Sequence, residues 1–293
     1  MFDFEKGPIK LILGGKYPHC HTVFVDDQKS ALIDAASKED TLRALDQRNP
    51  VKILLVSHGH EDHIMYNYLF PQAAFWVPEA DAHVFLSINN LLGCYSPTDE
   101  ERAQWKHLLL EQCHYEVRKA DRLLKDGDML EFGRTRCLVI HTPGHTPGHC
   151  AFHFPEEKVL FLADMDLVKG GPYYGDVASS IEQTLDSLLR LAAIDVEVYL
   201  TSHGRGIHDG DPDQIHRFAA HIQKRENALL EFLAQGPKTL EEVTQKGIIY
   251  GPPRVVAGWD LSISERSMMS KHLKRLEKQC RVTLEAGRYE FLE

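Results

Sequence analysis

The densest cluster of metal-binding residue types in this chain directly follows a short apolar run, and this combination constrains the fold more than any other feature. Residues 51–56 (VKILLV) are rich in aliphatic side chains and are typical of a buried strand. Residues 57–63 (SHGHEDH) then form the loop at the end of that strand. Its candidate ligands are His58, His60, Asp62 and His63. Because imidazole and carboxylate groups bind zinc and similar metals, the pattern predicts a metal site at a strand end.

Three other segments repeat this arrangement, in which an apolar run leads to a histidine or an aspartate. They are 136–140 before His145, 158–163 before Asp164, and 197–202 before His203. Loops at strand ends present side chains from a rigid sheet to one point. We therefore expect the four strand ends to converge on a single metal centre.

Length, charge and cysteine content narrow the class of protein. A chain of 293 residues is long enough for one large domain and a smaller one. The net charge of −10 disfavours nucleic-acid binding as the main role, because phosphates are neutralised by clustered Lys and Arg. The six cysteines form no CxxC pair, and we find no signal peptide or membrane-spanning run. We therefore expect a cytoplasmic protein with reduced thiols and no membrane partner.

The pattern along the chain predicts three parts. Residues 1–210 hold all four strand-end segments and form the catalytic domain. Within it, 78–122 is a helical insertion, which either covers the site as a lid or packs on the outside. Residues 211–236 are an amphipathic linking helix, and 237–293 follow as helix, helix and hairpin, which suits a small winged-helix-like domain.

These residues together resemble the metallo-β-lactamase superfamily. The likeness rests on HxHxDH at 58–63, then His145, Asp164 and His203 in that order, and covers about residues 10–210. The doubled HTPGH motif at 141–149 is similar to the glyoxalase II-like branch. The C-terminal part resembles β-lactamase-like proteins with a winged helix, one of which is an endoribonuclease. The resemblance implies an α/β fold, an αββα sandwich with metals at one edge and a small C-terminal winged-helix-like module.

The resemblance also implies a ligand set for two divalent metal ions. The first ion would be bound by His58, His60 and His145, the second by Asp62, His63 and His203, and Asp164 would bridge them. Zinc is the favoured metal, with iron or manganese as alternatives. Two divalent ions and two carboxylates leave a charge of +4 − 2 = +2, which lowers the pKa of a bridging water towards about 7. Asp62 and Asp164 are therefore the candidate catalytic residues.

Four further residues are candidates for contacting the substrate or supporting a ligand, although each also fits an ordinary packing role. They are His149, Tyr173, Tyr174 and His208. A second histidine can orient a metal ligand, and a phenol can donate to a developing oxyanion.

The leading functional hypothesis is a dinuclear metallo-hydrolase, in which a metal-bridging hydroxide attacks the carbonyl of a small thioester, lactone, ester or amide. One alternative is a mononuclear iron dioxygenase acting on persulfides, with only His58, His145 and Asp164 on the metal. Another is a single-strand nuclease that holds nucleic acid with the winged helix, although Glu277 interrupts the basic stripe of the 264–279 helix. The tail also suits a homodimer contact.

Overall fold

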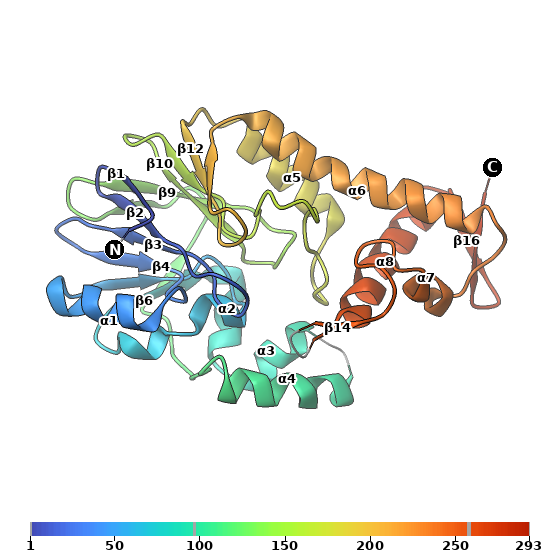
Figure 1. Cartoon of the computed structure of the whole chain (residues 1–293), viewed down its shortest axis with the longest axis horizontal. Helices are drawn as coiled ribbons and strands as arrows, with labels where there is room; N and C mark the ends of the chain where they lie inside the picture. The colour runs from blue at the N-terminus through green and yellow to red at the C-terminus, as the bar shows by residue number, and fades with distance from the viewer. Residues whose placement is uncertain (1, 96–97, 257–258, 293) are drawn as a thin grey trace.

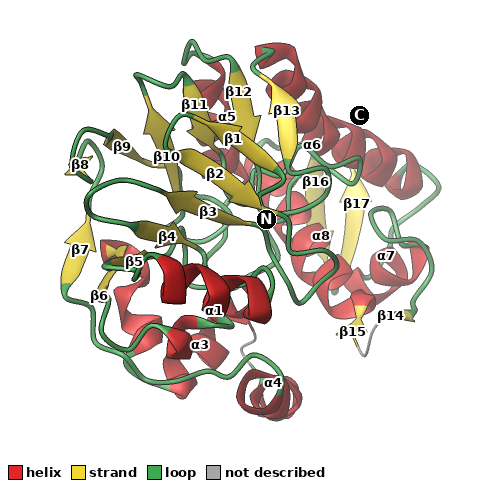
Figure 2. Cartoon of the chain, turned by 60° about the vertical axis from the view of Figure 1, so that its left-hand side comes forward, coloured by secondary structure: helices red, strands yellow, loops and turns green. Residues whose placement is uncertain are grey.

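Two β-sheets lie face to face, and helices cover the outer surface of each (Figures 1 and 2). The computed structural model describes residues 2–95, 98–256 and 259–292. Within this part of the chain the layers follow the order helix, sheet, sheet, helix, so the expected αββα sandwich is confirmed. None of the helices in these ranges is both long and apolar enough to cross a bilayer.

The first sheet follows the chain order from β1 to β7. Its described strands are β1 (Phe4–Lys6), β2 (Ile9–Ile12), β3 (Thr22–Val25), β4 (Ala31–Ile33), β5 (Ile53–Leu55), β6 (Ala74–Pro78) and β7 (Arg122–Leu124). Neighbours are antiparallel from β1 to β4 and parallel from β4 to β7. The carboxyl ends of β4, β5 and β6 therefore lie at one edge of the sheet.

The second sheet has the order β13-β12-β11-β10-β9-β8. Its described strands are β8 (Met129–Glu131), β9 (Arg136–His141), β10 (Cys150–Phe154), β11 (Val159–Phe161), β12 (Val198–Leu200) and β13 (Ile207–Asp209). Only β11 and β12 are parallel among these pairs, so both end at the same edge.

Helices fill the connections and the C-terminal part. In the described ranges they are α1 (Glu39–Arg48), α2 (Glu61–Ile64), the 3₁₀ turns η1 (Asn67–Leu69) and η2 (Glu79–Phe85), α3 (Ile88–Tyr95), α4 (Asp99–Glu111), α5 (Ile181–Ala192), α6 (Pro212–Leu233), α7 (Leu240–Lys246) and α8 (Leu261–Lys278). Two short hairpins complete the fold, β14 (Val255–Val256) with β15 (Trp259–Asp260) and β16 (Val282–Glu285) with β17 (Arg288–Phe291).

Side chains that alternate along the strands build separate cores on the two faces of each sheet. In β3, Val23 and Val25 point between the sheets, whereas Phe24 packs on the helical side with Leu42 of α1. In β10, Phe152 faces the first sheet and Ala151 faces the helices α5 and α6. This two-residue period explains why the central strands β4, β5 and β11 are entirely apolar: both of their faces are buried.

The helix that links the sandwich to the C-terminal part packs on both. Ile215 and Phe218 of α6 join the core against the second sheet, and Leu229 and Leu233 join a separate core with α7, α8 and β16. Asp211 caps the start of α6 by accepting from the Asp213 backbone N–H. One continuous helix of 22 residues therefore joins the two cores.

Between β6 and β7 the chain forms η2, α3 and α4, of which α3 and α4 are labelled in Figure 1. The C-terminal elements follow the expected order of helix, helix and hairpin. Their identification as a winged helix, like the domain boundaries, stays a prediction.

Candidate metal centre

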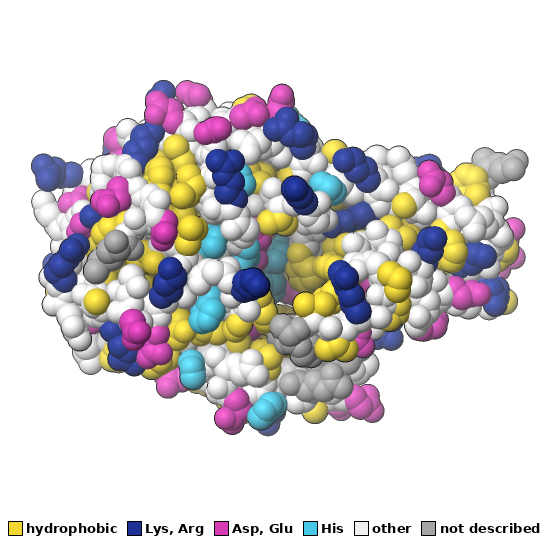
Figure 3. All heavy atoms as spheres, viewed as in Figure 1, with side chains coloured by type: hydrophobic (Ala, Val, Ile, Leu, Met, Phe, Trp, Pro, Cys, Tyr) yellow, Lys and Arg dark blue, Asp and Glu magenta, His cyan; other side chains and the backbone are white. Residues whose placement is uncertain are grey.

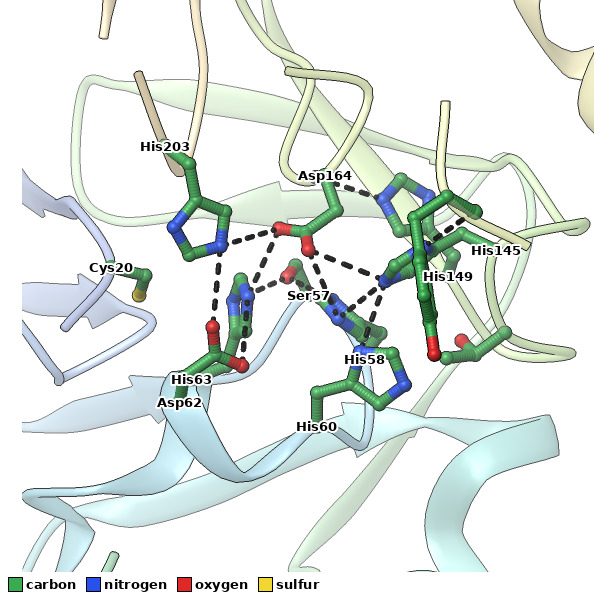
Figure 4. A network of polar contacts seen from close by, with 12 residues as sticks. Cys20, Ser57, His58, His60, Asp62, His63, His145, His149, Asp164 and His203 are labelled. Atoms are coloured by element: carbon green, nitrogen blue, oxygen red, sulfur yellow. Dashed lines mark hydrogen bonds and ion pairs between the residues drawn. The ribbon is translucent and has the colours of Figure 1, made fainter. Parts of the chain in front are cut away.

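The four strand-end loops meet at one edge of the sandwich, as the sequence predicts (Figure 4). The segment after β5, which includes α2, provides four candidate ligands, and the β9–β10 loop and the segments after β11 and β12 provide one each. In the described chain these residues converge as two groups, His58, His60, His145 and Asp164, and Asp62, His63 and His203. The ligand atoms of each group lie within 4.8 Å of one another. The surface is hollowed here, and histidine side chains gather in the hollow (Figure 3).

The first group is centred on the imidazole of His145. Its Nε2 lies 3.2 Å from His58 Nε2 and 3.0 Å from His60 Nδ1. The same Nε2 is 3.3 Å from Asp164 Oδ2. Three ring nitrogens thus face one carboxylate oxygen across a small space.

The second group shares Asp164 with the first. Asp164 Oδ1 lies 3.0 Å from His63 Nε2 and 3.4 Å from His203 Nε2. Asp62 closes the group, with Oδ2 at 3.3 Å from His203 Nε2 and Oδ1 at 3.7 Å from His63 Nε2. The two oxygens of Asp164 therefore face different groups, which is the geometry of a bridging carboxylate.

The distances between these atoms fit divalent metal ions. Ligands at the corners of a tetrahedron, each about 2.0–2.1 Å from zinc, lie about 3.3 Å apart. Moreover, His63 Nε2 and Asp164 Oδ1 are buried and neither makes a hydrogen bond within the described chain. Buried polar atoms without a partner are costly, so their convergence is explained by a cation between them.

The outer nitrogen of three imidazoles is fixed by an oxygen acceptor. His63 Nδ1 lies 2.9 Å from Asp34 Oδ2, and His60 Nε2–H donates to Asp176 Oδ2 at 2.6 Å. His145 Nδ1–H donates to the Tyr173 carbonyl oxygen at 3.0 Å. In the neutral form, each ring therefore points its lone pair into the group, as a metal ligand requires.

Burial and the charges of neighbouring groups shift the pKa values of several of these side chains. Burial lowers the pKa of His60, but the carboxylates of Asp176, Glu61 and Asp62 together outweigh burial and raise it to about 9. For His203, Asp166 and Asp164 likewise outweigh burial and raise the pKa to about 10. Burial raises the pKa of Asp164, but the neighbouring histidines hold it well below its usual value. The site is thus strongly polarised before any metal binds.

Asp81 in η2 holds two of the ligand loops together. Its Oδ2 accepts from the Gly59 N–H at 3.0 Å and from Thr146 Oγ1 at 2.7 Å, while Oδ1 accepts from the Gly148 N–H at 2.7 Å. A Cβ at position 148 would lie 2.5 Å from the Asp81 carboxyl carbon, so only glycine permits this approach. Asp81 thus fixes the loop that carries His58 against the loop that carries His145.

The helical insertion also contacts the metal loop through Glu61. The buried Glu61 carboxylate accepts from Tyr17 Oη at 2.7 Å and from the hydroxyl of Tyr95 in α3. The Tyr95 ring lies 5.6 Å from the His60 ring and stacks on Trp105 of α4 at 4.4 Å. The insertion thus packs against the segment that carries Glu61 and His60.

The four other candidates have different surroundings. His149 supports a ligand, because its Nε2 accepts from the Asp164 N–H at 3.2 Å while its Nδ1 contacts Thr142. Tyr173 packs its ring edge against His145 at 5.6 Å. Tyr174 turns away from the ligands, and its hydroxyl contacts Arg225 and His272. His208 lies in the edge strand β13 opposite Tyr199 and belongs to neither group.

Sequence reasoning missed several carboxylates that complete the site. Asp176 and Asp81 have no local signal, because their partners are 116 residues away in one case and up to 67 in the other. Asp166 is different: it follows Asp164 by two residues, and its Oδ1 accepts from the His203 N–H at 2.8 Å. The spacing Asp164–Met165–Asp166 was the available signal for this residue.

Comparison with known protein families gives a match over most of the sandwich. A sequence model of the metallo-beta-lactamase superfamily matches residues 17–203. Hydroxyacylglutathione hydrolase from Francisella philomiragia subsp. philomiragia is 24% identical over 182 residues, which are 62% of this chain and 58% of that protein. Hydroxyacylglutathione hydrolase from Bartonella tribocorum is 28% identical over 184 residues, which are 61% and 60% of the two chains. The match therefore spans less than two thirds of these relatives.

Two solved structures share the fold over nearly the whole chain. A metallo-beta-lactamase family protein from Thermus thermophilus has a TM-score of 0.75 at 24% identity and covers 97% of this chain and 98% of its own. A beta-lactamase domain protein from Burkholderia ambifaria has a TM-score of 0.75 at 18% identity, with 99% and 93% covered. The likeness thus includes the C-terminal part, which lies outside the matched residues 17–203.

Proposed function

The chain belongs to the metallo-beta-lactamase superfamily, and from this membership we propose that it is a metal-dependent hydrolase that cleaves a small thioester. Water would add to the acyl carbon, the carbon–sulfur bond would break, and a carboxylic acid and a thiol would form. The observation that carries the proposal is the pair of ligand groups joined by Asp164.

Two divalent ions fit these groups, and zinc is favoured by the nitrogen-rich donor set. The first ion would be held by His58, His60 and His145, the second by Asp62, His63 and His203, with Asp164 between them. When bound, the ions would supply an activated water at neutral pH and an electrophile that polarises the carbonyl oxygen. The second group argues against the three-ligand dioxygenase, because Asp62, His63 and His203 converge as tightly as the ligands of the first group.

The protein's own groups would bind and orient the reactants. Asp62 and Asp164 are the proposed catalytic residues: Asp62 orients the attacking water and passes its proton towards the leaving sulfur. Tyr95 and Tyr173 remain protonated, because burial and nearby carboxylates raise their pKa well above the ordinary value. They are therefore donors of hydrogen bonds and not bases. His149 holds the backbone of Asp164 in place.

The thioester class is supported by two considerations. The curated relatives that match here are named hydroxyacylglutathione hydrolase, although the match spans only part of their length. Chemically, a thiol has a pKa of about 8.5 and leaves with little protonation, so the reaction needs no separate strong acid. An amide nitrogen would require one.

The proposed domain organisation keeps a catalytic domain at 1–210, a linking helix at 211–236 and a winged-helix-like domain at 237–293. The separate C-terminal core of Leu229, Leu233, Val243, Met269 and Leu273 supports it. The C-terminal domain would support the small-molecule site and would not bind nucleic acid. The net charge of −10 disfavours a nucleic-acid substrate.

The experiment that tests the proposal combines metal analysis with a thioester assay. We expect close to two zinc ions per chain, hydrolysis of an acyl-glutathione or acyl-thiocholine, and loss of both in Asp164→Ala. One iron per chain with oxygen uptake on persulfides would favour the dioxygenase instead. A protein that takes up no metal from zinc, iron or manganese solutions would refute both readings.

A further inference from the structure

The loop at 170–177, between β11 and α5, touches metal-ligand histidines on one side and the C-terminal helices on the other. Its sequence, GGPYYGDV, is rich in glycine and proline and predicts only a loop. In the structure several polar groups of the loop contact either ligand histidines or the C-terminal helices α6 and α8. The inference below rests on the proposed function, because it concerns the same metal centre.

The inward contacts of the loop reach only the first ligand group. The Tyr173 carbonyl oxygen accepts from His145 Nδ1–H, and the Asp176 carboxylate accepts from His60 Nε2–H. Asp176 is 2% exposed, so its charge is not screened by water. The loop thus sets the orientation of two of the three imidazoles that would hold the first ion.

The outward contacts begin at Arg225 of α6. Its guanidinium donates to the carbonyl oxygens of Gly170 at 2.6 Å and Pro172 at 2.7 Å, and to Tyr174 Oη at 2.6 Å. Arg225 is 6% exposed, and its planar donors match three acceptors of one short loop. A buried cation used in this way orders the loop backbone directly.

Helix α8 holds the other end of the loop. Tyr174 Oη–H donates to His272 Nε2 at 2.7 Å, and the Ser267 hydroxyl donates to the Gly175 carbonyl oxygen. Lys271 Nζ donates to the Val177 carbonyl oxygen at 3.4 Å. The Tyr174 side chain also packs with Ile222 of α6 and Met268 of α8 in a small shared core. Helices α6 and α8 therefore both contact the loop.

The second ligand group has no such dependence in the described chain. Asp34 Oδ2, directly after β4, lies 2.9 Å from His63 Nδ1, and Asp166, just after β11, accepts from the His203 backbone N–H. Both supports belong to the sandwich. The two ion positions thus differ in which part of the protein holds their ligands.

We infer that Arg225 and His272 are positioning residues by which the C-terminal helices set the metal affinity of the first ligand group and leave the second group unaffected. Partners that hold a ligand imidazole typically change metal affinity by about 10–100-fold when they are removed. Loss of Arg225 releases the loop that carries both partners, so an effect of this size is expected at one site only.

The test is a zinc titration of the full chain by competition with a chelating indicator. Arg225→Met removes the donors and keeps the length of the side chain. Arg217→Met is the matched control, because Arg217 lies on the same helix with a side chain that is 66% exposed and pairs with Asp211. His60→Ala removes one ligand of the first group, and His203→Ala removes one ligand of the second group. The binding step that each variant loses therefore identifies the step of that group in the wild type.

We expect Arg225→Met to weaken the step assigned to the first group by about 10–100-fold and to leave the other step unchanged, with Arg217→Met equal to wild type. If Arg225→Met weakens both binding steps equally, or weakens neither step, the inference is overturned. Zinc binding by the wild type would still support the proposed function in that case. If Arg225→Met fails to fold, Tyr174→Phe decides: a weaker first step alone supports the inference, and unchanged binding overturns it. A wild type that binds no zinc refutes the proposed function itself.

Discussion

Replacing Asp81 by asparagine should weaken both the fold and the metal site, because this carboxylate joins two ligand loops. Asp81 is 2% exposed, and its two oxygens accept three hydrogen bonds, one at Oδ1 and two at Oδ2. An asparagine has one acceptor oxygen, so its NH₂ group must face a backbone N–H of either Gly59 or Gly148. At least one charged hydrogen bond is lost and one buried N–H remains unpaired, which costs about 2–4 kcal/mol.

This cost has two measurable results. At about 2–4 °C per kcal/mol for a large domain, the melting temperature of Asp81→Asn should fall by about 4–16 °C. Because the two loops carry His58 and His145, the apparent zinc affinity of the first group should also fall, by about 10–100-fold. Differential scanning calorimetry gives the first value, and competition with a zinc indicator gives the second.

The matched control is Asp99→Asn, a change of the same type in α4 of the same insertion, where the side chain is 99% exposed. It should leave both values within experimental error of the wild type. An Asp81→Asn protein that melts within about 1 °C of wild type and binds zinc as tightly would refute the reasoning, since three buried hydrogen bonds would then carry no measurable energy.

Three further predictions concern protons, metal removal and the insertion. The raised pKa values of His60 (about 9) and His203 (about 10) mean that both are protonated at pH 7 before a metal binds. Since only neutral imidazole binds zinc, zinc binding should release protons, and the zinc affinity should increase as the pH rises from 7 towards 9. Isothermal titration calorimetry in buffers of different ionisation enthalpy measures the proton release. A heat of binding that is the same in all these buffers would contradict the prediction. Removal of zinc by a chelator should lower the melting temperature by about 10 °C per site relative to protein kept in free zinc at about 1,000 times Kd, because binding then contributes about 4 kcal/mol. An unchanged melting curve would count against a structural effect of the metals. Finally, Tyr95→Phe removes a donor to the buried Glu61 carboxylate and should cost about 1.5–3 kcal/mol in urea unfolding. Tyr68→Phe, whose hydroxyl contacts the exposed Glu39, is the control, and an equal cost in both variants would argue against the buried contact.

The candidate ligands were predictable because each follows the end of a strand. His58, His145, Asp164 and His203 lie far apart in the chain, but each follows a strand whose carboxyl end lies at the same edge of the sandwich, and the structure brings them together there. The αββα layers were predictable for a related reason. Apolar residues at successive strand positions require cover on both faces of a sheet.

The supports of those ligands were not predictable, because they depend on side-chain directions after folding. Asp176 becomes a partner of His60 only when the loop at 170–177 folds back over the site. Tyr173 and Tyr174 illustrate the same limit. They are adjacent and chemically alike, yet one packs on His145 and the other on His272, and no local pattern distinguishes them.

The insertion that contains η2, α3 and α4 is the connection between two parallel strands, since Trp76 of β6 pairs in register with Arg122 of β7. The sheet fixes both ends of such a crossover connection, so the residues between its ends can be replaced without a change in the strand pairing. In this chain, however, the same segment contains Asp81 and Tyr95, which hold the ligand loops. A transplanted crossover would therefore need to bring an equivalent carboxylate with it to keep the loops of His58 and His145 together.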